Sequence, residues 1–294
     1  MKIDLYKDNK KDFADDTLDI LRGNEVQNNV LIKIANRFKN GEYKEDWYCA
    51  SVKDNGGGVM TAAVCTPPHN LVIYETGNRH DGAALNLLAR ELYNAGYEPP
   101  GVLGEQVTAE LFAESYAQVS GRNKRAHMSL NAMQLLEVSK ISGCAPGFMR
   151  EICADDICFA PYWELEFVRE CNIDPWTTLA DTVNSFNDML GKRKHYIWID
   201  KTPVATASFM RENFEGASIS KVYTPPFYRG RGYCTALMAR LSQDLLGRGY
   251  KYCCLFADAD YPESNKVYRK IGYKDICLYR EIKFEQLKFG RGKL

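Results

Sequence analysis

The segment Arg229-Gly230-Arg231-Gly232 has the residue types of an anion-binding loop. It follows a run of residues typical of a β-strand and precedes an amphipathic helical pattern. The first N–H groups of a helix have no partner inside the helix, and the helix dipole favours an anion beside them. Glycines allow the backbone to close around phosphate oxygens, and the two arginines add positive charge. The segment therefore predicts a phosphate site, although a basic surface turn would have the same composition.

Two common phosphate motifs do not fit this segment. A nucleotide-binding P-loop needs a Lys-Ser/Thr pair after its last glycine, and none follows Gly232. A dinucleotide-binding fingerprint lies inside a βαβ unit, whereas the strands before residue 229 read as antiparallel. The chemistry of the loop is therefore not that of a nucleotide triphosphatase or a dehydrogenase.

Asn265 and Tyr268 form a second candidate pair. They lie three positions apart in a helix predicted from Ser264 to about Ile271, so their side chains share one helix face and could line one channel. A tyrosine on an amphipathic helix is more often a core residue than an acid. The pair acquires meaning only together with the loop at 229–232.

Regular elements in the second half of the chain position these candidates. The apolar pattern predicts a helix opened by Asn172-Ile173-Asp174-Pro175, and then antiparallel strands at 195–200, 204–210 and 217–224. A helix after Gly232, a buried strand at 252–257, the helix with Asn265 and a strand near 277–282 complete the order. This is an α+β domain that begins near residue 145.

The first half repeats this order more faintly. Its expected strands and helices stay in register with the second half at an offset of about 150 residues, as after a duplication. The strands are predicted at 47–52, 59–65, 71–75, 102–103 and 128–136, and the helices at 82–95 and 107–119. We therefore expect two domains, 1–140 and 145–294, each a mixed, mostly antiparallel sheet flanked by helices.

Together these motifs resemble the GNAT superfamily of acyl-CoA-dependent N-acetyltransferases, whose pyrophosphate motif is Arg/Gln-x-x-Gly-x-Gly/Ala. Arg229, Gly232 and Cys234 occupy its positions, with Cys234 in place of the usual Gly or Ala. The resemblance implies that Asn265 contacts the pantetheine arm of acetyl-CoA and that Tyr268 protonates the departing thiolate. It also implies that backbone N–H groups bind the diphosphate, from Arg229, Gly230, Arg231, Gly232, Tyr233, Cys234 and Thr235.

The resemblance further implies direct attack of a neutral amine on the thioester carbonyl. The strand ending at 220–224 would separate from its neighbour and offer an N–H group to the oxyanion. The two prolines that follow have no N–H to give, so the donor is Val222, Tyr223 or Thr224, and we favour Val222 and Thr224 as the pair that faces the cofactor.

The base that deprotonates the acceptor is a separate question. Asp258, at the end of a buried strand, is the first candidate, followed by Glu212 and Glu215, while a water relay is the alternative to all three. Each of these carboxylates is more often a solvated loop residue or a cap. The segment 162–166 falls where relatives contact the acceptor, or it is an amphipathic helix with a packed Trp163.

The first half carries an altered copy of both motifs. Arg79-His80-Asp81-Gly82-Ala83-Ala84 fits the phosphate skeleton, but Asp81 would place a carboxylate beside the diphosphate. Tyr116 is present in the later helix, whereas Ala113 stands where the second half has its Asn. We expect this half to be structural or to shape the substrate site.

Composition narrows the class of partner. Lys plus Arg and Asp plus Glu number 38 each, which disfavours nucleic acid or a membrane as a partner held by bulk charge. The ten cysteines and four histidines show no metal-ligand spacing, so we expect reduced thiols and no metal. No stretch has the roughly 20 apolar residues of a membrane span, and the acidic start is unlike a signal peptide, so we expect a cytoplasmic protein.

These inferences give one function and two alternatives. We expect an N-acetyltransferase that moves an acetyl group from acetyl-CoA to the primary amine of a small molecule, working as a monomer or a homodimer. One alternative is a non-catalytic acyl-CoA-binding regulatory module. The other is a protein or peptide N-acetyltransferase.

Overall fold

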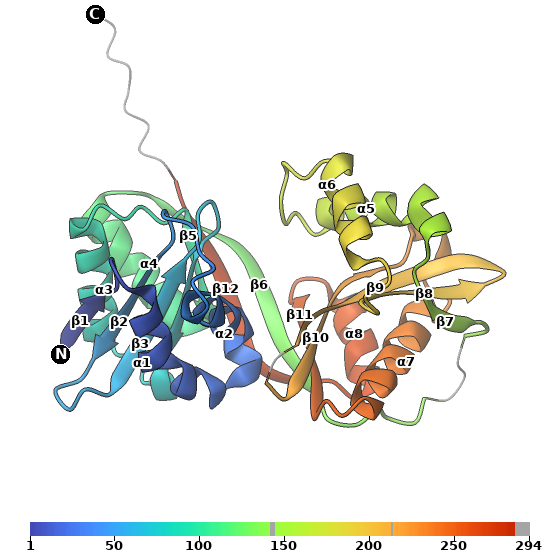
Figure 1. Cartoon of the computed structure of the whole chain (residues 1–294), viewed down its shortest axis with the longest axis horizontal. Helices are drawn as coiled ribbons and strands as arrows, with labels where there is room; N and C mark the ends of the chain where they lie inside the picture. The colour runs from blue at the N-terminus through green and yellow to red at the C-terminus, as the bar shows by residue number, and fades with distance from the viewer. Residues whose placement is uncertain (142–144, 213, 286–294) are drawn as a thin grey trace, which may run out of the picture. The chain divides into compact units, whose positions relative to one another are not determined.

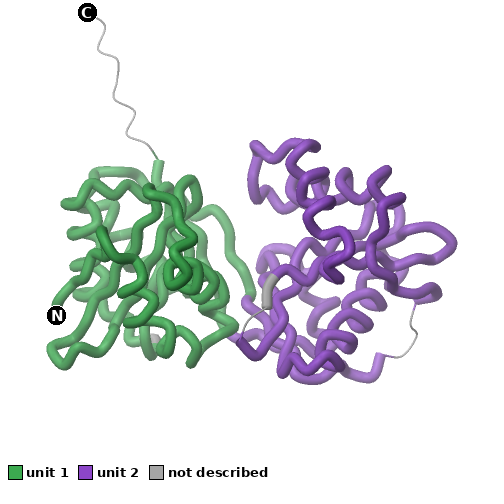
Figure 2. Tube along the Cα trace, in the orientation of Figure 1, with its two compact units in different colours: residues 1–131, 277–294 green, residues 132–276 purple. Residues whose placement is uncertain are grey.

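The chain forms two compact units. The computed structural model describes residues 1–141, 145–212 and 214–285. The first unit consists of Met1–Asn131 and Cys277–Leu294, and the second unit of Ala132–Ile276 (Figure 2). The last strand of the chain thus belongs to the first unit. The expected division at 1–140 and 145–294 follows the repeated order of elements rather than compactness, and it stays a prediction.

The first unit is a sheet with helices on both faces (Figure 1). Its strand order is β1-β2-β3-β4-β5-β12-β6, in which β4 and β5 are parallel and the pairs β1–β2, β2–β3, β3–β4 and β5–β12 are antiparallel. Side chains alternate between the faces of a strand, so one face packs on α1 and α2 and the other on α3 and α4. The elements are β1 (Lys2–Leu5), α1 (Lys10–Arg22), α2 (Glu25–Lys39), β2 (Tyr48–Lys53), β3 (Val59–Cys65), β4 (Leu71–Glu75), α3 (Gly82–Asn94), β5 (Gly101–Glu105), α4 (Gln106–Ser120), β6 (Lys124–Leu135) and β12 (Lys274–Phe284).

The second unit has the same construction. Its strand order is β6-β11-β10-β9-β8-β7, with the last residues of β6 from Ala132 on at one edge. The pairs β7–β8, β8–β9 and β9–β10 are antiparallel, and β10–β11 is parallel. The main core lies between the sheet and α7 and α8, and a smaller one lies under α5 and α6. The elements are β7 (Phe148–Glu151), α5 (Ala160–Glu170), α6 (Leu179–Met189), β8 (His195–Asp200), β9 (Thr202–Glu212), β10 (Gly216–Tyr223), α7 (Tyr233–Gly247), β11 (Tyr252–Asp258) and α8 (Pro262–Ile271).

The expected α+β class, with two tandem mixed sheets flanked by helices, is confirmed. One helix start was wrong, because α6 begins at Leu179 and not at Pro175. Thr178 and Asp181 form a reciprocal cap, in which the Thr178 hydroxyl accepts from the Asp181 N–H and the Asp181 carboxylate accepts from the Thr178 N–H. Asp174 instead accepts from the Trp176 N–H in a turn, which leaves the Trp176 side chain 85% exposed. The helix therefore starts after the Thr178 cap, and the segment from Asp174 forms a turn before it.

Candidate functional site

The parallel strands β10 and β11 separate toward their carboxyl ends. They pair from Gly216 with Tyr252 to Ser218 with Cys254, and no later pair forms in the described parts of the two strands. The cause is a bulge in β10: Ser220 pairs with Ser208 and Tyr223 pairs with Thr206, so β10 holds one residue more than β9. A bulge bends the strand that carries it and adds local twist. The strand ends therefore diverge where the sequence predicted an opening.

The loop before α7 leaves the helix N-terminus available to an anion. Gly230 and Gly232 have φ angles of 74° and 82°, the left-handed region that favours glycine. Gly232 is the N-cap of α7 and has no side chain to bond the N–H groups of the first turn. A side chain at Gly230 would meet nothing within 4 Å. This arrangement fits the diphosphate of a coenzyme A thioester.

The two arginines of the loop do not point at this N-terminus. The Arg229 N–H donates to the Pro226 carbonyl, and its guanidinium donates to Glu170 Oε1 and Oε2 at 2.8 and 2.6 Å. The Arg231 guanidinium lies over the ring of Phe227, 5.1 Å from the centroid. The expected positive charge is present beside the helix start, but Arg229 is held by a carboxylate that the sequence analysis did not identify.

The helix α8 buries both residues of the second motif. The Asn265 amide nitrogen donates to the carbonyls of Asp258 and Tyr261, at 2.6 and 2.9 Å. Both of its N–H hydrogens are thus used to hold the turn after β11, so Asn265 also positions that turn. The expected contact with pantetheine stays a prediction for the side-chain carbonyl oxygen.

Tyr268 lies in the main core of the second unit, with its ring against Tyr273 at 5.9 Å between centroids. Burial raises the pKa of Tyr268 well above its usual value, and the neighbouring thiols of Cys234 and Cys171 act in the same direction. The hydroxyl is therefore protonated at neutral pH, the state that a proton donor needs. Burial also raises the pKa of the Cys234 thiol to about 12. Cys234 is therefore an uncharged thiol that lines the site and not a nucleophile.

Carboxylates gather at the ends of the separated strands. Asp258 ends β11, and its Oδ1 accepts from the Asp260 N–H. Glu170 ends α5, where its Oε1 lies 3.4 Å from the Tyr223 hydroxyl of β10. Burial, followed by the charges of Asp258 and Glu170, raises the pKa of the Cys171 thiol to about 11, which places this thiol near both carboxylates. The structure thus brings Asp258 to the expected place and adds Glu170.

The other base candidates differ from Asp258 in position. Glu215 lies before β10, at the edge where the strands still pair, and forms an ion pair with Lys251. At about 3.3 Å per residue, the length of β10 separates it from Tyr223 by more than 20 Å. The side chain of Glu212 lies outside the described residues. Glu215 therefore lies at the end of β10 opposite to the opening and is no longer a candidate base.

The face of the sheet under α5 and α6 is unusually polar. Lys221, in the bulge with a φ of 52°, donates to Glu164 Oε1 at 2.5 Å and to the Ser185 hydroxyl at 2.9 Å. The buried His195 contacts the Thr206 hydroxyl. No local pattern in the sequence marks these partners, because Lys221 and Glu164 are 57 residues apart. The polar layer fixes α5 over the bulged part of β10.

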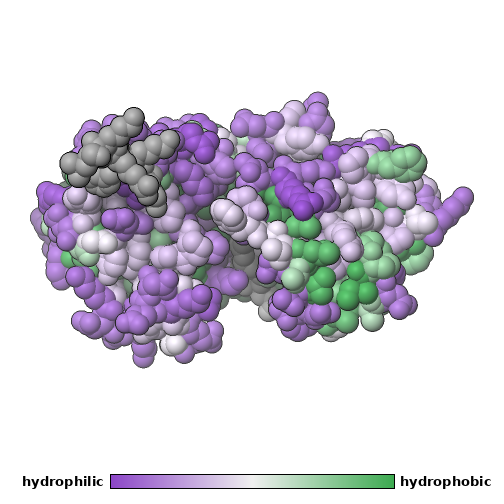
Figure 3. Space-filling model, turned by 90° about the horizontal axis from the view of Figure 1, so that it is seen from above, coloured by the Kyte–Doolittle hydropathy of each residue, from purple (hydrophilic) through white to green (hydrophobic). Residues whose placement is uncertain are grey.

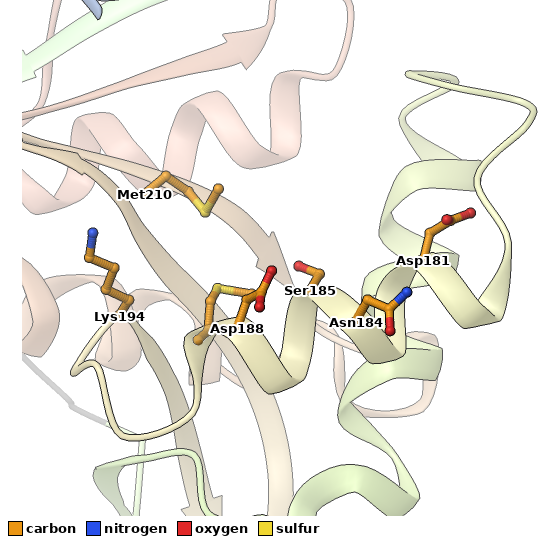
Figure 4. A pocket seen from close by; sticks show the side chains of 7 residues that line it. Asp181, Asn184, Ser185, Asp188, Lys194 and Met210 are labelled. Atoms are coloured by element: carbon orange, nitrogen blue, oxygen red, sulfur yellow. The ribbon is translucent and has the colours of Figure 1, made fainter. Parts of the chain in front are cut away.

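A pocket opens on the same face. It is lined by residues of α6, with Met210 on β9 and Lys194 before β8 (Figure 4). Met210 lies between the β9 partners of Ser218 and Ile219, so this pocket is displaced along the strands from Tyr223.

Figure 3 shows hydrophobic side chains gathered on one face of the second unit. Phe227 and Tyr261, both exposed, flank the loop and the turn of the site.

The first unit satisfies its own loop with carboxylates. Asp81 is the N-cap of α3, where it accepts from the N–H groups of Ala83 and Ala84. The buried Glu75 accepts from the N–H groups of His80 and Asp81 at 2.9 and 2.6 Å. The positions that would hold phosphate oxygens are thus already occupied by protein oxygens.

The channel and the acid of the first unit are altered as well. Strand β5 lies so close to β4 that a Cβ on Gly104 would be 2.8 Å from the Ile73 carbonyl oxygen, just beyond the last paired residues. The Tyr116 hydroxyl donates to the Tyr97 carbonyl at 2.8 Å, so Tyr116 is engaged in structure.

The described residues hold neither a metal-ligand cluster nor a membrane-spanning helix. No group of three or more histidine, cysteine or acidic side chains is placed to hold a metal ion in the described ranges. Among the helices described, none has both the length and the apolar character needed to cross a bilayer.

The chain is similar to known proteins both in sequence, through one family model, and in fold. Residues 162–273 match the model of the acetyltransferase (GNAT) family, and no curated protein matches the chain. The fold is similar to an acetyltransferase from the GNAT family of Colwellia psychrerythraea, with a TM-score of 0.56 and 12% identity over 97% of this chain and 99% of that one. It is also similar to a GCN5-related N-acetyltransferase from Sphaerobacter thermophilus, with a TM-score of 0.58 and 16% identity over 80% of each chain.

A third similar structure also spans both units. A tandem GNAT protein from the clavulanic acid biosynthesis pathway covers 96% of this chain and 98% of its own, with a TM-score of 0.54 and 12% identity. At such identities these likenesses concern the fold. The chain has a tandem GNAT fold, and its residues 162–273 match the acetyltransferase (GNAT) family.

Proposed function

We propose that the second half of the chain is an N-acetyltransferase that transfers the acetyl group of acetyl-CoA to the primary amine of a small molecule. The observation that carries the proposal is the opening between β10 and β11, together with the uncapped start of α7 and the buried Tyr268 near Cys234 of that helix. A diphosphate at α7 would lead its pantetheine arm into this opening. The N–H groups from Gly230 to Thr235 and the side chain of Asn265 are the proposed contacts, since the Arg229 N–H already donates to the Pro226 carbonyl.

The bulge supplies the oxyanion donor in this proposal. Because β10 holds one residue more than β9 between Ser220 and Tyr223, one N–H group there is withdrawn from the ladder. The N–H of Val222, inside the bulge, or that of Thr224, just beyond the last pair with β9, can then donate to the thioester oxygen as negative charge develops. Tyr223 is the neighbour whose side chain faces α5, near Trp163 and Glu170.

The proton transfers follow from the carboxylates and the phenol. As the acceptor nitrogen bonds to the carbonyl carbon, its proton passes to Asp258, directly or through water. The carbon–sulfur bond breaks, and the Tyr268 hydroxyl gives its proton to the sulfur. Because the phenol and the leaving thiolate share one buried environment, desolvation raises both pKa values and the transfer between them stays balanced.

The first unit has a different role in this proposal. Its loop is filled by Glu75 and Asp81, which supports a structural or substrate-shaping role. We also propose that the chain works in the cytoplasm, as a monomer or a homodimer.

Calorimetric titration with acetyl-CoA tests the function. Wild-type protein is expected to bind at one site per chain, and Gly232→Leu is expected to abolish binding because a side chain would fill the anion position. Gly249→Leu is the matched control, since Gly249 also has a positive φ, of 100°, and open space around it, at the other end of α7. Both variants carry the same backbone strain, roughly 1–2 kcal/mol.

The outcomes separate the alternatives. Binding lost in Gly232→Leu and kept in Gly249→Leu supports the proposed site, and a screen of amines for release of free thiol then distinguishes the enzyme from a binding module. Two sites per chain would show that the first unit binds as well. No binding by the wild-type protein would refute the proposal.

A further inference from the structure

The Arg229–Glu170 ion pair connects the two sides of the proposed site. Arg229 lies three residues before the N-cap of α7, on the cofactor side. Glu170 is the last residue of α5, on the side of Tyr223. The guanidinium donates to both Glu170 oxygens and, through Nε, to the Thr224 carbonyl at 2.8 Å. One side chain therefore touches the loop, the end of β10 and the end of α5.

We propose, on the basis of the function proposed above, that acetyl-CoA binding moves the Arg229 guanidinium from Glu170 to the diphosphate. The Glu170 carboxylate, released from this ion pair, then binds the ammonium group of the acceptor. The order of binding is thereby fixed, with acetyl-CoA first. The acceptor class is a cationic amine that carries no carboxylate near its reacting nitrogen.

The ion pair is weak enough to exchange. The side chains of Arg229 and Glu170 are 38% and 41% exposed, so water screens their attraction. A phosphate beside the uncapped N–H groups of α7 offers the guanidinium more charge and a bidentate partner. The Arg229 guanidinium also lies over the ring of Tyr223, 5.7 Å from its centroid.

The surroundings of Glu170 select the acceptor. With Arg229 gone, no cation among the described contacts balances Glu170, and the charges of both Glu170 and Asp258 act on the Cys171 thiol. Burial and then the charge of Glu170 raise the pKa of Tyr223 to about 12, so the neighbouring hydroxyl stays neutral. Two carboxylates near one opening attract an ammonium group and repel a substrate that carries a carboxylate.

Calorimetry on the full chain tests the exchange. Glu170→Gln removes the competitor for Arg229, so it is expected to tighten acetyl-CoA binding by about two- to fivefold, the range that one partly exposed ion pair corresponds to. Arg229→Met is expected to weaken binding, and in the double variant the effect of Glu170→Gln is expected to vanish. A purely structural role of Glu170 would leave the affinity unchanged or weaken it.

The matched control is another exposed arginine–carboxylate pair of the second unit. Arg269 donates to both oxygens of Asp275, and their side chains are 49% and 46% exposed. Asp275→Asn is therefore expected to leave acetyl-CoA affinity unchanged. If Glu170→Gln behaves like Asp275→Asn, the exchange does not occur. If the wild-type protein fails to bind acetyl-CoA, the proposed function itself is wrong, which is a distinct result.

The acceptor part is tested with two probes of equal length. We expect 1,4-diaminobutane to bind the protein saturated with CoA, to bind at least tenfold more weakly without CoA, and to lose binding to the CoA complex in Glu170→Gln. We expect no binding of 4-aminobutyrate, in which a carboxylate replaces one aminomethyl group. Equal binding of 1,4-diaminobutane with and without CoA, absence of its binding to the CoA complex, or equal binding of 4-aminobutyrate would overturn the proposal.

Discussion

His195 makes the stability of the second unit depend on pH. It lies on β8 under α5, with 2% of its surface exposed, and its Nε2 contacts the Thr206 hydroxyl. Its Nδ1 has no hydrogen-bond partner among the described residues. Burial is the main cause that lowers the pKa of His195 to about 4; the charge of Lys221 acts in the same direction and that of Asp156 opposes it. The folded protein therefore keeps this imidazole neutral.

The size of the effect follows from linkage. An unfolded histidine has a pKa of about 6.5, so the difference is about 2.5 units, and at 1.36 kcal/mol per unit it amounts to about 3 kcal/mol. Because the folded pKa is the lower one, the unfolded state binds the proton first. The contribution is fully present above pH 6.5 and is lost as the pH falls from about 6.5 to about 4.

Denaturant unfolding at a series of pH values measures this loss. Three of the four tryptophans, at 163, 176 and 198, belong to the second unit, so fluorescence reports mainly on it. Wild-type protein is expected to lose about 3 kcal/mol between pH 7 and pH 4 through His195, in addition to the loss from other groups. His195→Gln is expected to show a profile flatter by that amount, with a lower plateau because the Thr206 contact changes.

The comparison with a matched control decides the matter. His69 is exposed, so His69→Gln is expected to follow the wild-type profile. If His195→Gln and wild type lose stability in parallel as the pH falls, then His195 is protonated in the folded state and the reasoning from burial is wrong.

Three further predictions test other parts of the molecule. Tyr268→Phe keeps the ring against Tyr273, so kcat is expected to fall about 100-fold or more with unchanged acetyl-CoA affinity, measured by thiol release with an active amine; an unchanged kcat would exclude Tyr268 as the acid. Glu164→Gln leaves the half-buried Lys221 without its counter-charge and is expected to destabilise the second unit by about 3 kcal/mol in denaturant unfolding. Adding Lys221→Met is expected to restore much of this stability. Equal losses in the single and the double variant would contradict the ion-pair argument. Asp81→Ala removes the cap of α3, with an expected loss of about 1 kcal/mol and no change in acetyl-CoA affinity by calorimetry; altered affinity would give the first unit a ligand role.

Local patterns in the sequence determined most of the fold. Strands β3, β4 and β8 have the expected bounds, because each is a short apolar run with turn residues at its ends. The phosphate loop and the face shared by Asn265 and Tyr268 could also be read, since they depend on neighbours along the chain. The start of α6 was wrong because two capping signals lay four residues apart, and their relative strength depends on geometry.

The contacts that define the acceptor side could not be read from the sequence. Glu170 and Arg229 are 59 residues apart, and nothing in the composition of either segment pairs them. The same holds for Glu164 with Lys221, which meet only because the bulge turns Lys221 toward α5. Glu215 was a candidate base because it lies between two strands, but its position at the paired edge depends on the direction of β10 in the sheet.

The two units differ in how the same unsatisfied N–H groups are treated. At the start of α3 the chain supplies Asp81 and Glu75, which satisfy these groups in the free protein. At the start of α7 the cap is Gly232, which leaves the groups to water. A cap is worth about 1 kcal/mol, so the second unit forgoes this stabilisation in the absence of a ligand. Because a ligand that binds only the folded state adds its binding free energy to stability, acetyl-CoA should stabilise the second unit and leave the first unchanged.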